Sequence, residues 1–293
     1  RTILQLGAWN NMGFKSWESY HYFFREVTRK NRYIYSDDVQ DFLSNVLETS
    51  KAREKFVASG SLFWRAQLGS YTPPRPTSET TPQFTNEELR ALDPVPFSHE
   101  RMKPVQFEAP EGRVNAKGLP CLYLATTKET AIAEVRPWLD SNISVGQFEV
   151  VKNLRLIDCS VHPSEVKIIY LEEPDDQTKE EMVWENIDEA FSEPVTPNDK
   201  TSDYVPTQII AELFKHNGYD GVIYRSAQSD GLNVALFDID AATMVKSFLY
   251  RVETITYSFE QQEPMDYDAF RKNISDQIEP QLKARGLEEL PPI

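Results

Sequence analysis

Helical and strand-like apolar patterns follow one another irregularly along this chain, and this order limits its fold class more than any other feature. Apolar residues recur at helical spacing in residues 16–30 and 36–53, and each segment opens with a serine suited to an N-cap, Ser16 and Ser36. The period then changes to that of a buried strand in residues 60–68. Because helices and strands alternate irregularly after this point, the sequence predicts a mixed α+β domain rather than a doubly wound sheet.

Further strands are expected downstream of the first. Short apolar runs bounded by Gly, Pro or polar residues predict them at residues 119–125, 145–151, 154–158, 168–171, 221–226 and 233–237. Neither G-x-G-x-x-G nor G-x-x-x-x-G-K-[ST] occurs in the chain. The sequence therefore lacks the standard dinucleotide-binding and P-loop motifs.

Two more helices are predicted from their end signals. Residues 126–129 (Thr-Thr-Lys-Glu) have the form of a capping box, which predicts a helix at residues 130–138. Another helix is expected to begin at Ser202 or Asp203 and to stop at residues 217–218 (Asn-Gly).

Charge is unevenly distributed along the chain. The formal net charge is -15, and residues 1–70 carry +3 of it, so the remainder carries -18. A body this acidic repels a nucleic-acid backbone, which argues against nucleic-acid binding by the main domain. An acidic run at residues 172–181 is interpreted as a solvated loop and the first turn of a helix rather than a metal site.

Several classes of protein are disfavoured by what the sequence lacks. No segment approaches the ~20 apolar residues that a membrane-spanning helix needs, and the N-terminus lacks the order of a signal peptide. We therefore expect a cytoplasmic protein without membrane contact. Cys121 and Cys159 lack C-x-x-C spacing, and the 4 histidines form no helical metal-binding pair, so no metal is expected.

Three segments carry motifs that are specific in combination. They are residues 62–66 (Leu-Phe-Trp-Arg-Ala), residues 112–135, and residues 218–227, which run on to Asn233. The middle segment holds an arginine, then a Gly-x-Pro strand with Leu-Tyr-Leu-Ala, then a helix with Ala-x-x-Glu. Agreement of this length with one family pattern is improbable by chance.

Together these segments resemble the RES domain, a bacterial toxin family named for an Arg, a Glu and a Ser. Arg113, Tyr123 and Glu134 keep the order and spacing of the family pattern, and the resemblance covers about residues 60–250. It implies a fold similar to that of ADP-ribosyltransferases. It also implies consumption of NAD+ by hydrolysis or phosphorolysis, and neutralisation by a separate antitoxin protein.

The resemblance divides the chain into three predicted parts. Residues 1–59 are expected to form an N-terminal helical extension, and residues 60–250 the RES domain. A proline-rich passage at about residues 70–111 is expected to be a long insertion in that domain. Residues 251–293 are expected to form a C-terminal extension packed on it.

The resemblance assigns catalysis to Glu134, Arg65 and Ser226. When nicotinamide leaves NAD+, a ribosyl cation develops, and a carboxylate such as that of Glu134 stabilises it electrostatically. Arg65 offers a rigid, permanently charged fork for pyrophosphate oxygens. Ser226 is expected to hydrogen-bond the nicotinamide amide or the ribose, or to orient Glu134.

Three further residues are expected to bind NAD+, which serves as substrate, so that no cofactor is implied. Arg113 is suited to a second phosphate contact. Tyr123 offers an aromatic face to the cationic nicotinamide ring, and its hydroxyl can bond a polar partner. Asn233, at the end of the third segment, completes the expected set.

Two other functions stay open at the level of sequence. A protein ADP-ribosyltransferase would use the same residues and pass ADP-ribose to a protein. A module that binds a nucleotide or another protein without turnover would keep the scaffold and lose the chemistry. The leading hypothesis is an NAD+-degrading enzyme that acts as a growth-arresting toxin or defence effector.

Overall fold

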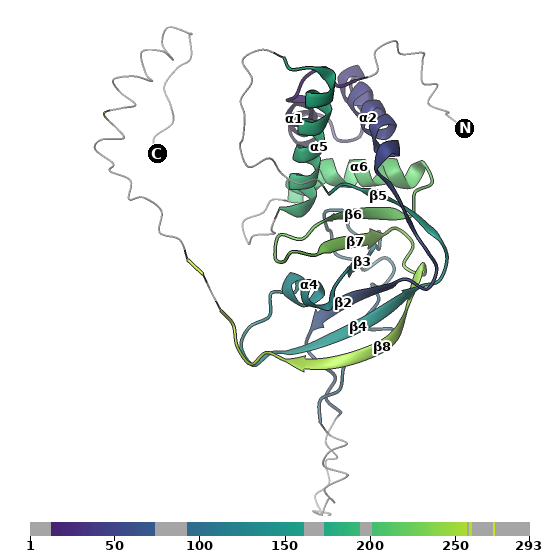
Figure 1. Ribbon diagram of the computed structural model, residues 1–293, viewed down its shortest axis with the longest axis vertical. Helices are drawn as coiled ribbons and strands as arrows, with labels where there is room; N and C mark the ends of the chain where they lie inside the picture. Colours follow the sequence, from purple (N-terminus) through teal and green to yellow (C-terminus); the bar gives the residue numbers. More distant parts are fainter. Residues whose placement is uncertain are drawn as a thin grey trace, which may run out of the picture. The chain divides into compact units, whose positions relative to one another are not determined.

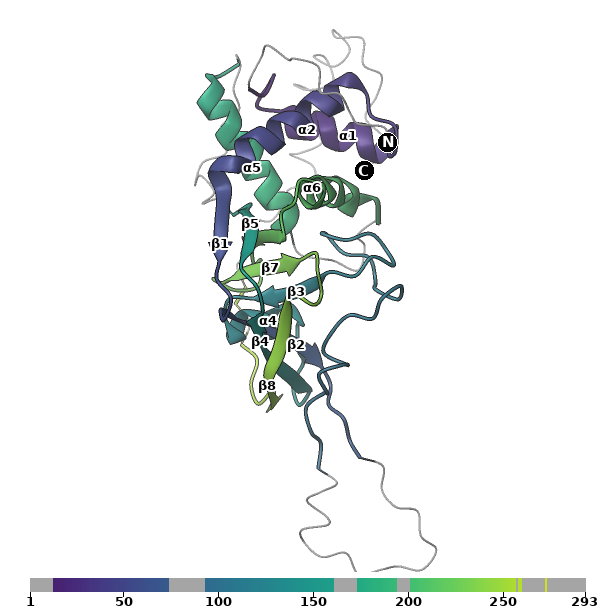
Figure 2. The same ribbon diagram turned by 90° about the vertical axis from the view of Figure 1, so that its right-hand side faces the viewer.

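The centre of the fold is one mixed β-sheet. The computed structural model describes residues 13–73, 93–160, 173–193, 201–256, 258–259 and 272. The 8 strands lie in the order β1-β5-β6-β7-β3-β2-β4-β8; Figure 1 shows the order from β5 to β8, and Figure 2 shows β1 beside β5. They are β1 (Glu54–Val57), β2 (Leu62–Leu68), β3 (Leu122–Ala125), β4 (Asn142–Val150), β5 (Leu154–Asp158), β6 (Gly221–Arg225), β7 (Leu232–Leu236) and β8 (Ala242–Arg251).

Neighbouring strands are antiparallel except for one pair. Strands β5 and β6 run parallel, and each remaining pair in the sheet is antiparallel. A mostly antiparallel sheet with helices gathered beside it is an α+β architecture. The predicted fold class is therefore confirmed.

The helices form two groups. They are α1 (Ser19–Arg29), α2 (Asp37–Ser50), α4 (Lys128–Glu134), α5 (Asp176–Ser192) and α6 (Val205–His216), with short 3-10 turns η1 (Lys51–Arg53) and η2 (Thr201–Tyr204). Helices α1, α2, α5 and α6 pack on one another next to β5 and β6 (Figures 1 and 2). Helix α4 packs separately against β2, β3 and β4.

Alternating side chains of the central strands face two different cores. On β6, Val222 and Tyr224 pack with the helical group, whereas Ile223 packs into the core on the opposite face. Successive strand residues point to opposite faces, which explains this division. The second core also contains Met102, 0% exposed, which fastens the segment before β3 to the sheet.

The N-terminal segment contributes a strand as well as helices. Strand β1 pairs with β5 at the edge of the sheet, although it lies within the predicted extension 1–59. Phe23 and Phe42 stack with ring centroids 4.5 Å apart and join the core of the helical group. The segment therefore shares its core with α5, α6 and β6.

The predicted cap of the first helix is wrong, and that of the second is confirmed. Helix α1 begins at Ser19 after Glu18, which makes no side-chain cap hydrogen bond. Ser16 donates its hydroxyl to Oε1 of Glu173 at 2.6 Å and accepts from the amide of Glu18 at 3.2 Å, so it contacts the residue before the helix without capping it. Ser36 accepts a hydrogen bond from the amide of Val39, as its position predicted.

Helix α4 is shorter than predicted and begins earlier. Thr127, not Thr126, is its N-cap and accepts from the amide of Thr130. The helix ends at Glu134 because Arg136, with φ 45°, precedes a proline and cannot continue the α conformation. Glu134 therefore lies in the last position of the helix.

The start of α6 also differs from the prediction. Ser202 and Asp203 lie in η2, and the helix begins at Val205 with no side-chain cap. The predicted stop is confirmed, since Gly218 follows the last turn with φ 82°, a conformation that glycine adopts without steric cost.

Some predictions are untested by the structure. Most of residues 254–293 and all of the predicted strand at 168–171 lie outside the described residues. The packing of residues 251–293 and the proposed limits of the insertion stay predictions. None of the described helices is long and apolar enough to cross a membrane.

Candidate active site

Glu134 accepts two hydrogen bonds on the same carboxylate oxygen. Ser226 donates from Oγ to Oε1 at 2.6 Å, and Asn233 donates from Nδ2 to Oε1 at 2.7 Å. The side chain of Glu134 is exposed, so its carboxylate remains accessible to a ligand. Within the described part of the chain, Oε2 makes no hydrogen bond, which leaves that oxygen available to a substrate.

Strand register brings these three residues together. Asn233 on β7 pairs with Ala125 at the end of β3 and with Tyr224 on β6. Ser226 directly follows β6, and Glu134 ends the helix that follows β3. The end of β6, the start of β7 and the end of α4 therefore meet at one end of the central strands.

The turn between β6 and β7 is fastened to α4. Ser229 and Thr130 share a hydrogen bond of 2.8 Å, and Thr130 in turn contacts the capping hydroxyl of Thr127 at 2.7 Å. A Cβ atom at Gly231 would lie 2.0 Å from Oγ1 of Thr130. Only glycine allows this close approach, which holds Ser226 beside α4.

Arg65 on β2 is half-buried and has unused hydrogen-bonding capacity. Its Nη1 donates to the carbonyl of Tyr123 at 2.8 Å, while its buried Nε has no partner within the described residues. Burial lowers the pKa of this guanidinium, and the positive charge of Arg101 lowers it further. A half-buried cation whose buried Nε has no partner is a candidate ligand for an anion.

Tyr123 holds the loop that carries Arg113. Its hydroxyl donates to Oδ1 of Asn115 at 2.7 Å and accepts from the amide of Val114 at 3.1 Å. Burial raises the pKa of this phenol well above its usual value, so it stays protonated. Both hydrogen bonds of the hydroxyl are therefore made within the protein, and the aromatic ring of Tyr123 is the part that can contact a ligand.

Arg113 is anchored at the C-terminal end of α5. The side chain donates from Nη1 to the carbonyl of Ala190 at 2.9 Å, and its guanidinium lies 5.2 Å from the ring centroid of Tyr204. The last carbonyls of a helix attract a cation. Arg113 is 8% exposed, so only a small part of it can reach a ligand.

One cleft of about 770 Å³ joins most of the predicted site residues. Arg65, Arg113, Tyr123, Glu134 and Asn233 all line it, and Ser226 reaches it through its hydrogen bond to Glu134. The structure therefore brings all six predicted residues to one place. Asn233 hydrogen-bonds Glu134, and the expected contact of Asn233 with NAD+ stays a prediction.

Several cleft residues were missed by the sequence analysis. They include Gln67, Arg101, Tyr224 and Gln228. Tyr224 has a signal in the sequence, because it lies two positions before Ser226 on a strand and therefore shares its face. Arg101 has none, since it lies in a proline-rich passage without a regular pattern.

An ion pair between a buried aspartate and a half-buried arginine supports the wall of the cleft. Asp188 on α5 is 0% exposed and pairs with Arg225, the residue before Ser226. Asp188 also accepts from the hydroxyl of Ser192 at 3.2 Å. The pair joins the last turn of α5, which holds Arg113, to the end of β6.

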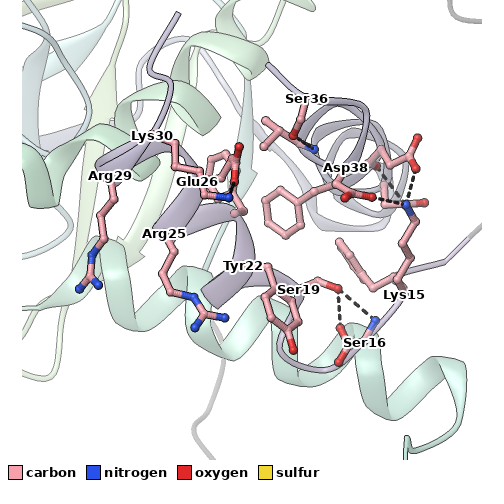
Figure 3. A pocket seen from close by; sticks show the side chains of 16 residues that line it. Lys15, Ser16, Ser19, Tyr22, Arg25, Glu26, Arg29, Lys30, Ser36 and Asp38 are labelled. Carbon is pink, nitrogen blue, oxygen red and sulfur yellow. Dashed lines mark hydrogen bonds and ion pairs between the residues drawn. The ribbon is translucent and has the colours of Figure 1, made fainter. Parts of the chain in front are cut away.

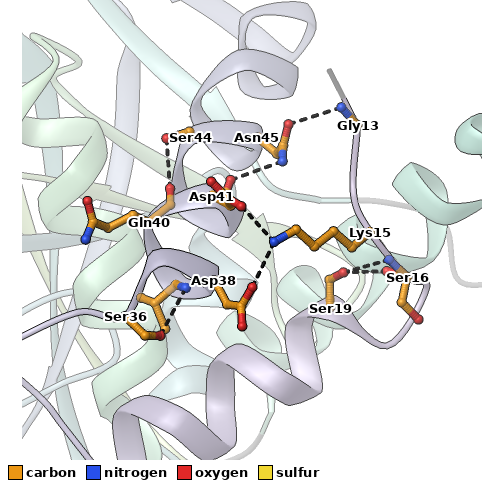
Figure 4. A network of polar contacts seen from close by, with 11 residues as sticks. Gly13, Lys15, Ser16, Ser19, Ser36, Asp38, Gln40, Asp41, Ser44 and Asn45 are labelled. Atoms are coloured by element: carbon orange, nitrogen blue, oxygen red, sulfur yellow. Dashed lines mark hydrogen bonds and ion pairs between the residues drawn. The ribbon is translucent and has the colours of Figure 1, made fainter. Parts of the chain in front are cut away.

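A second hollow, of about 630 Å³, lies between α1 and α2 and contains none of the predicted site residues (Figure 3). Lys15 crosses it to Asp38 and Asp41 at 2.8 and 2.7 Å (Figure 4). These contacts raise the pKa of Lys15 and link the segment before α1 to α2. Within the described residues, no group of three or more His, Cys, Asp or Glu is arranged to hold a metal ion.

Comparison with known proteins identifies the class. The family model for the RES domain matches residues 88–260, more than half of the chain. The chain therefore belongs to the RES-domain family, as its motifs predicted.

Comparison with individual proteins assigns no function. No curated protein matches the chain. Among solved structures, a chain of the M. tuberculosis MbcT-MbcA toxin-antitoxin complex matches with a TM-score of 0.34 and 15% identity, covering 71% of this chain and 92% of that one. A likeness this distant assigns no residue a role.

Proposed function

We propose that this protein cleaves NAD+ between nicotinamide and ribose. The observation that carries the proposal is the accessible carboxylate of Glu134, held by Ser226 and Asn233 in a cleft that also contains Arg65. Membership of the RES-domain family supports it, since the family resemblance implies NAD+ consumption.

Cleavage of NAD+ needs little catalytic assistance to the leaving group. The bond between C1′ of the ribose and the ring nitrogen breaks, and nicotinamide leaves as a neutral molecule with the bonding electrons. Positive charge then develops on the ribose, and the carboxylate of Glu134 stabilises it. An acceptor oxygen forms the new bond to C1′, and its proton is released to solvent.

The two donors on Oε1 have a defined role in this reaction. Ser226 and Asn233 fix the orientation of the carboxylate before substrate binds, which lowers the cost of reorganisation during reaction. Oε2 is left to face the ribose. Arg65 is positioned to bind the diphosphate, and its unpartnered Nε supplies a hydrogen bond that the anion satisfies.

The family resemblance also supports a biological role. We propose that NAD+ depletion makes the protein a growth-arresting toxin or defence effector of the cytoplasm, and that a separate antitoxin neutralises it. A bound antitoxin is then expected to suppress nicotinamide release in the purified complex.

The direct test is incubation of purified protein with NAD+, with and without phosphate, followed by product identification. Release of nicotinamide with free ADP-ribose identifies water as acceptor, and ADP-ribose phosphate identifies phosphate. Mass spectrometry that finds ADP-ribose on cell proteins instead identifies a protein ADP-ribosyltransferase. Absence of nicotinamide release above the buffer rate refutes the proposal and favours a non-catalytic binding module.

A further inference from the structure

Arg101 adds a second cation to the neighbourhood of Arg65. Both residues line the same cleft, and the charge of Arg101 lowers the pKa of Arg65. Two guanidinium groups that repel each other destabilise the empty cleft. A bound anion removes this repulsion.

The position of Arg101 is fixed by β2. Its Nη1 donates to Oε1 of Gln67 at 2.8 Å. Gln67 lies two residues after Arg65 on the strand, so the two side chains point to the same face. The guanidinium of Arg101 also lies 5.0 Å from the ring centroid of Phe97. Strand geometry therefore directs both cations to one side of β2.

The segment that carries Arg101 is docked firmly on the sheet. Met102 is fully buried, and the amide of Phe97 donates to Oγ of the buried Ser144 at 2.9 Å. Lys103 forms an ion pair with Asp240 at 2.9 Å. The residues before and after Arg101 in the sequence therefore anchor its backbone to the sheet.

Neither cation is neutralised within the described part of the chain. No carboxylate there forms an ion pair with Arg65 or Arg101, although the protein as a whole carries a net charge of -15. Arg101 hydrogen-bonds an uncharged amide and Arg65 a carbonyl, so neither of these partners carries a negative charge. An uncompensated pair of this kind is typical of a phosphate-binding site.

We propose that Arg101 is a substrate-binding residue that, together with Arg65, binds the diphosphate of the dinucleotide. The assignment rests on the proposed function for the identity of the ligand. Gln67 is a positioning residue in this arrangement, because it holds the guanidinium of Arg101 at the cleft. The passage before β3 thereby becomes part of the active site.

The test is calorimetric titration of purified full-length protein with ADP-ribose, which carries the diphosphate and cannot release nicotinamide. We expect Arg101→Gln to weaken binding roughly 10- to 100-fold, as the loss of a charge-assisted contact does. Arg101→Lys should weaken ADP-ribose binding less, because it keeps the charge and loses only the bidentate geometry of the guanidinium. The difference from wild type should shrink as salt rises.

Arg155→Gln is the matched control. Arg155 is also a surface arginine, but it pairs with Glu54 at 2.7 Å and does not line the cleft. This variant removes the same charge and should bind ADP-ribose as wild type does. Circular dichroism of each variant checks that the fold is retained.

The outcomes separate this inference from the proposed function. Weakened ADP-ribose binding in Arg101→Gln supports the inference even if wild type fails to turn over NAD+. Wild-type affinity in that variant overturns the inference even if NAD+ turnover is normal. Failure of wild type to bind ADP-ribose also overturns it.

Discussion

Asn233 donates from Nδ2 to Oε1 of Glu134 at 2.7 Å, although the two residues lie on different elements and 99 positions apart. Ser226 donates to the same oxygen from the end of the neighbouring strand. Convergence of two donors on one oxygen fixes the plane of the carboxylate. Each member of this arrangement can be tested separately.

Replacement of the carboxylate gives the sharpest test of the chemistry. We expect Glu134→Ala and Glu134→Gln to lower the rate of nicotinamide release roughly 100-fold or more, because charge stabilisation of the ribosyl cation is lost. The fold should be retained, since the side chain is exposed. Thermal denaturation serves as the control, and unchanged turnover in either variant excludes Glu134 as the catalytic group.

The two donors should act mainly on kcat. Ser226→Ala and Asn233→Ala should each lower kcat roughly tenfold, because each leaves one donor on Glu134. Asn233→Asp should lower it more than Asn233→Ala, since it places a like charge against the carboxylate. Steady-state kinetics distinguishes this from a role in binding NAD+. A rise in KM with unchanged kcat would instead make Asn233 a substrate ligand.

Arg65 should act on binding and on stability. Arg65→Ala removes the cation that faces the cleft and the donor to the carbonyl of Tyr123. We expect KM for NAD+ to rise and the folded protein to be less stable, because the carbonyl of Tyr123 loses this donor. Arg65→Lys separates the effects by keeping the charge, and its KM should lie between those of wild type and Arg65→Ala. Equal KM values in all three would remove Arg65 from the binding site.

The ion pair of Asp188 and Arg225 should matter for folding. Asp188 is fully buried, so Asp188→Asn should lower the free energy of unfolding by about 3 kcal/mol, as breaking a buried pair does. Glu54→Gln, which breaks a more exposed pair with Arg155, should cost less than about 1 kcal/mol. Urea denaturation of both variants measures the difference. Equal losses would mean that burial does not strengthen the Asp188 pair.

The cysteines should be unreactive in the folded protein. Burial raises the pKa of Cys121 to about 12 and that of Cys159 well above its usual range. Only the thiolate reacts with iodoacetamide, and at pH 8 both groups remain thiols. Mass spectrometry should find no alkylation until denaturant is added, whereupon both should react. Rapid labelling at pH 8 without denaturant would show that these thiols are accessible.

Local patterns were sufficient for several elements of the fold. The strand at Leu154–Asp158 has the predicted bounds, and Ser36 caps its helix, because both depend on short-range spacing and hydrogen bonding. Strands β1 and β8 were missed. Both are edge strands with exposed and polar positions, so they lack the clear alternation of a buried strand.

The sequence by itself determined the family, through the order and spacing of Arg113, Tyr123 and Glu134, and the mixed α+β class. Only the tertiary structure decided that Ser226 and Asn233 both bind one oxygen of Glu134, and that Arg101 enters the cleft. These contacts join segments far apart in the chain. They depend on which strands pair and in what register, and that choice is made by packing of the whole sheet rather than by local residue patterns.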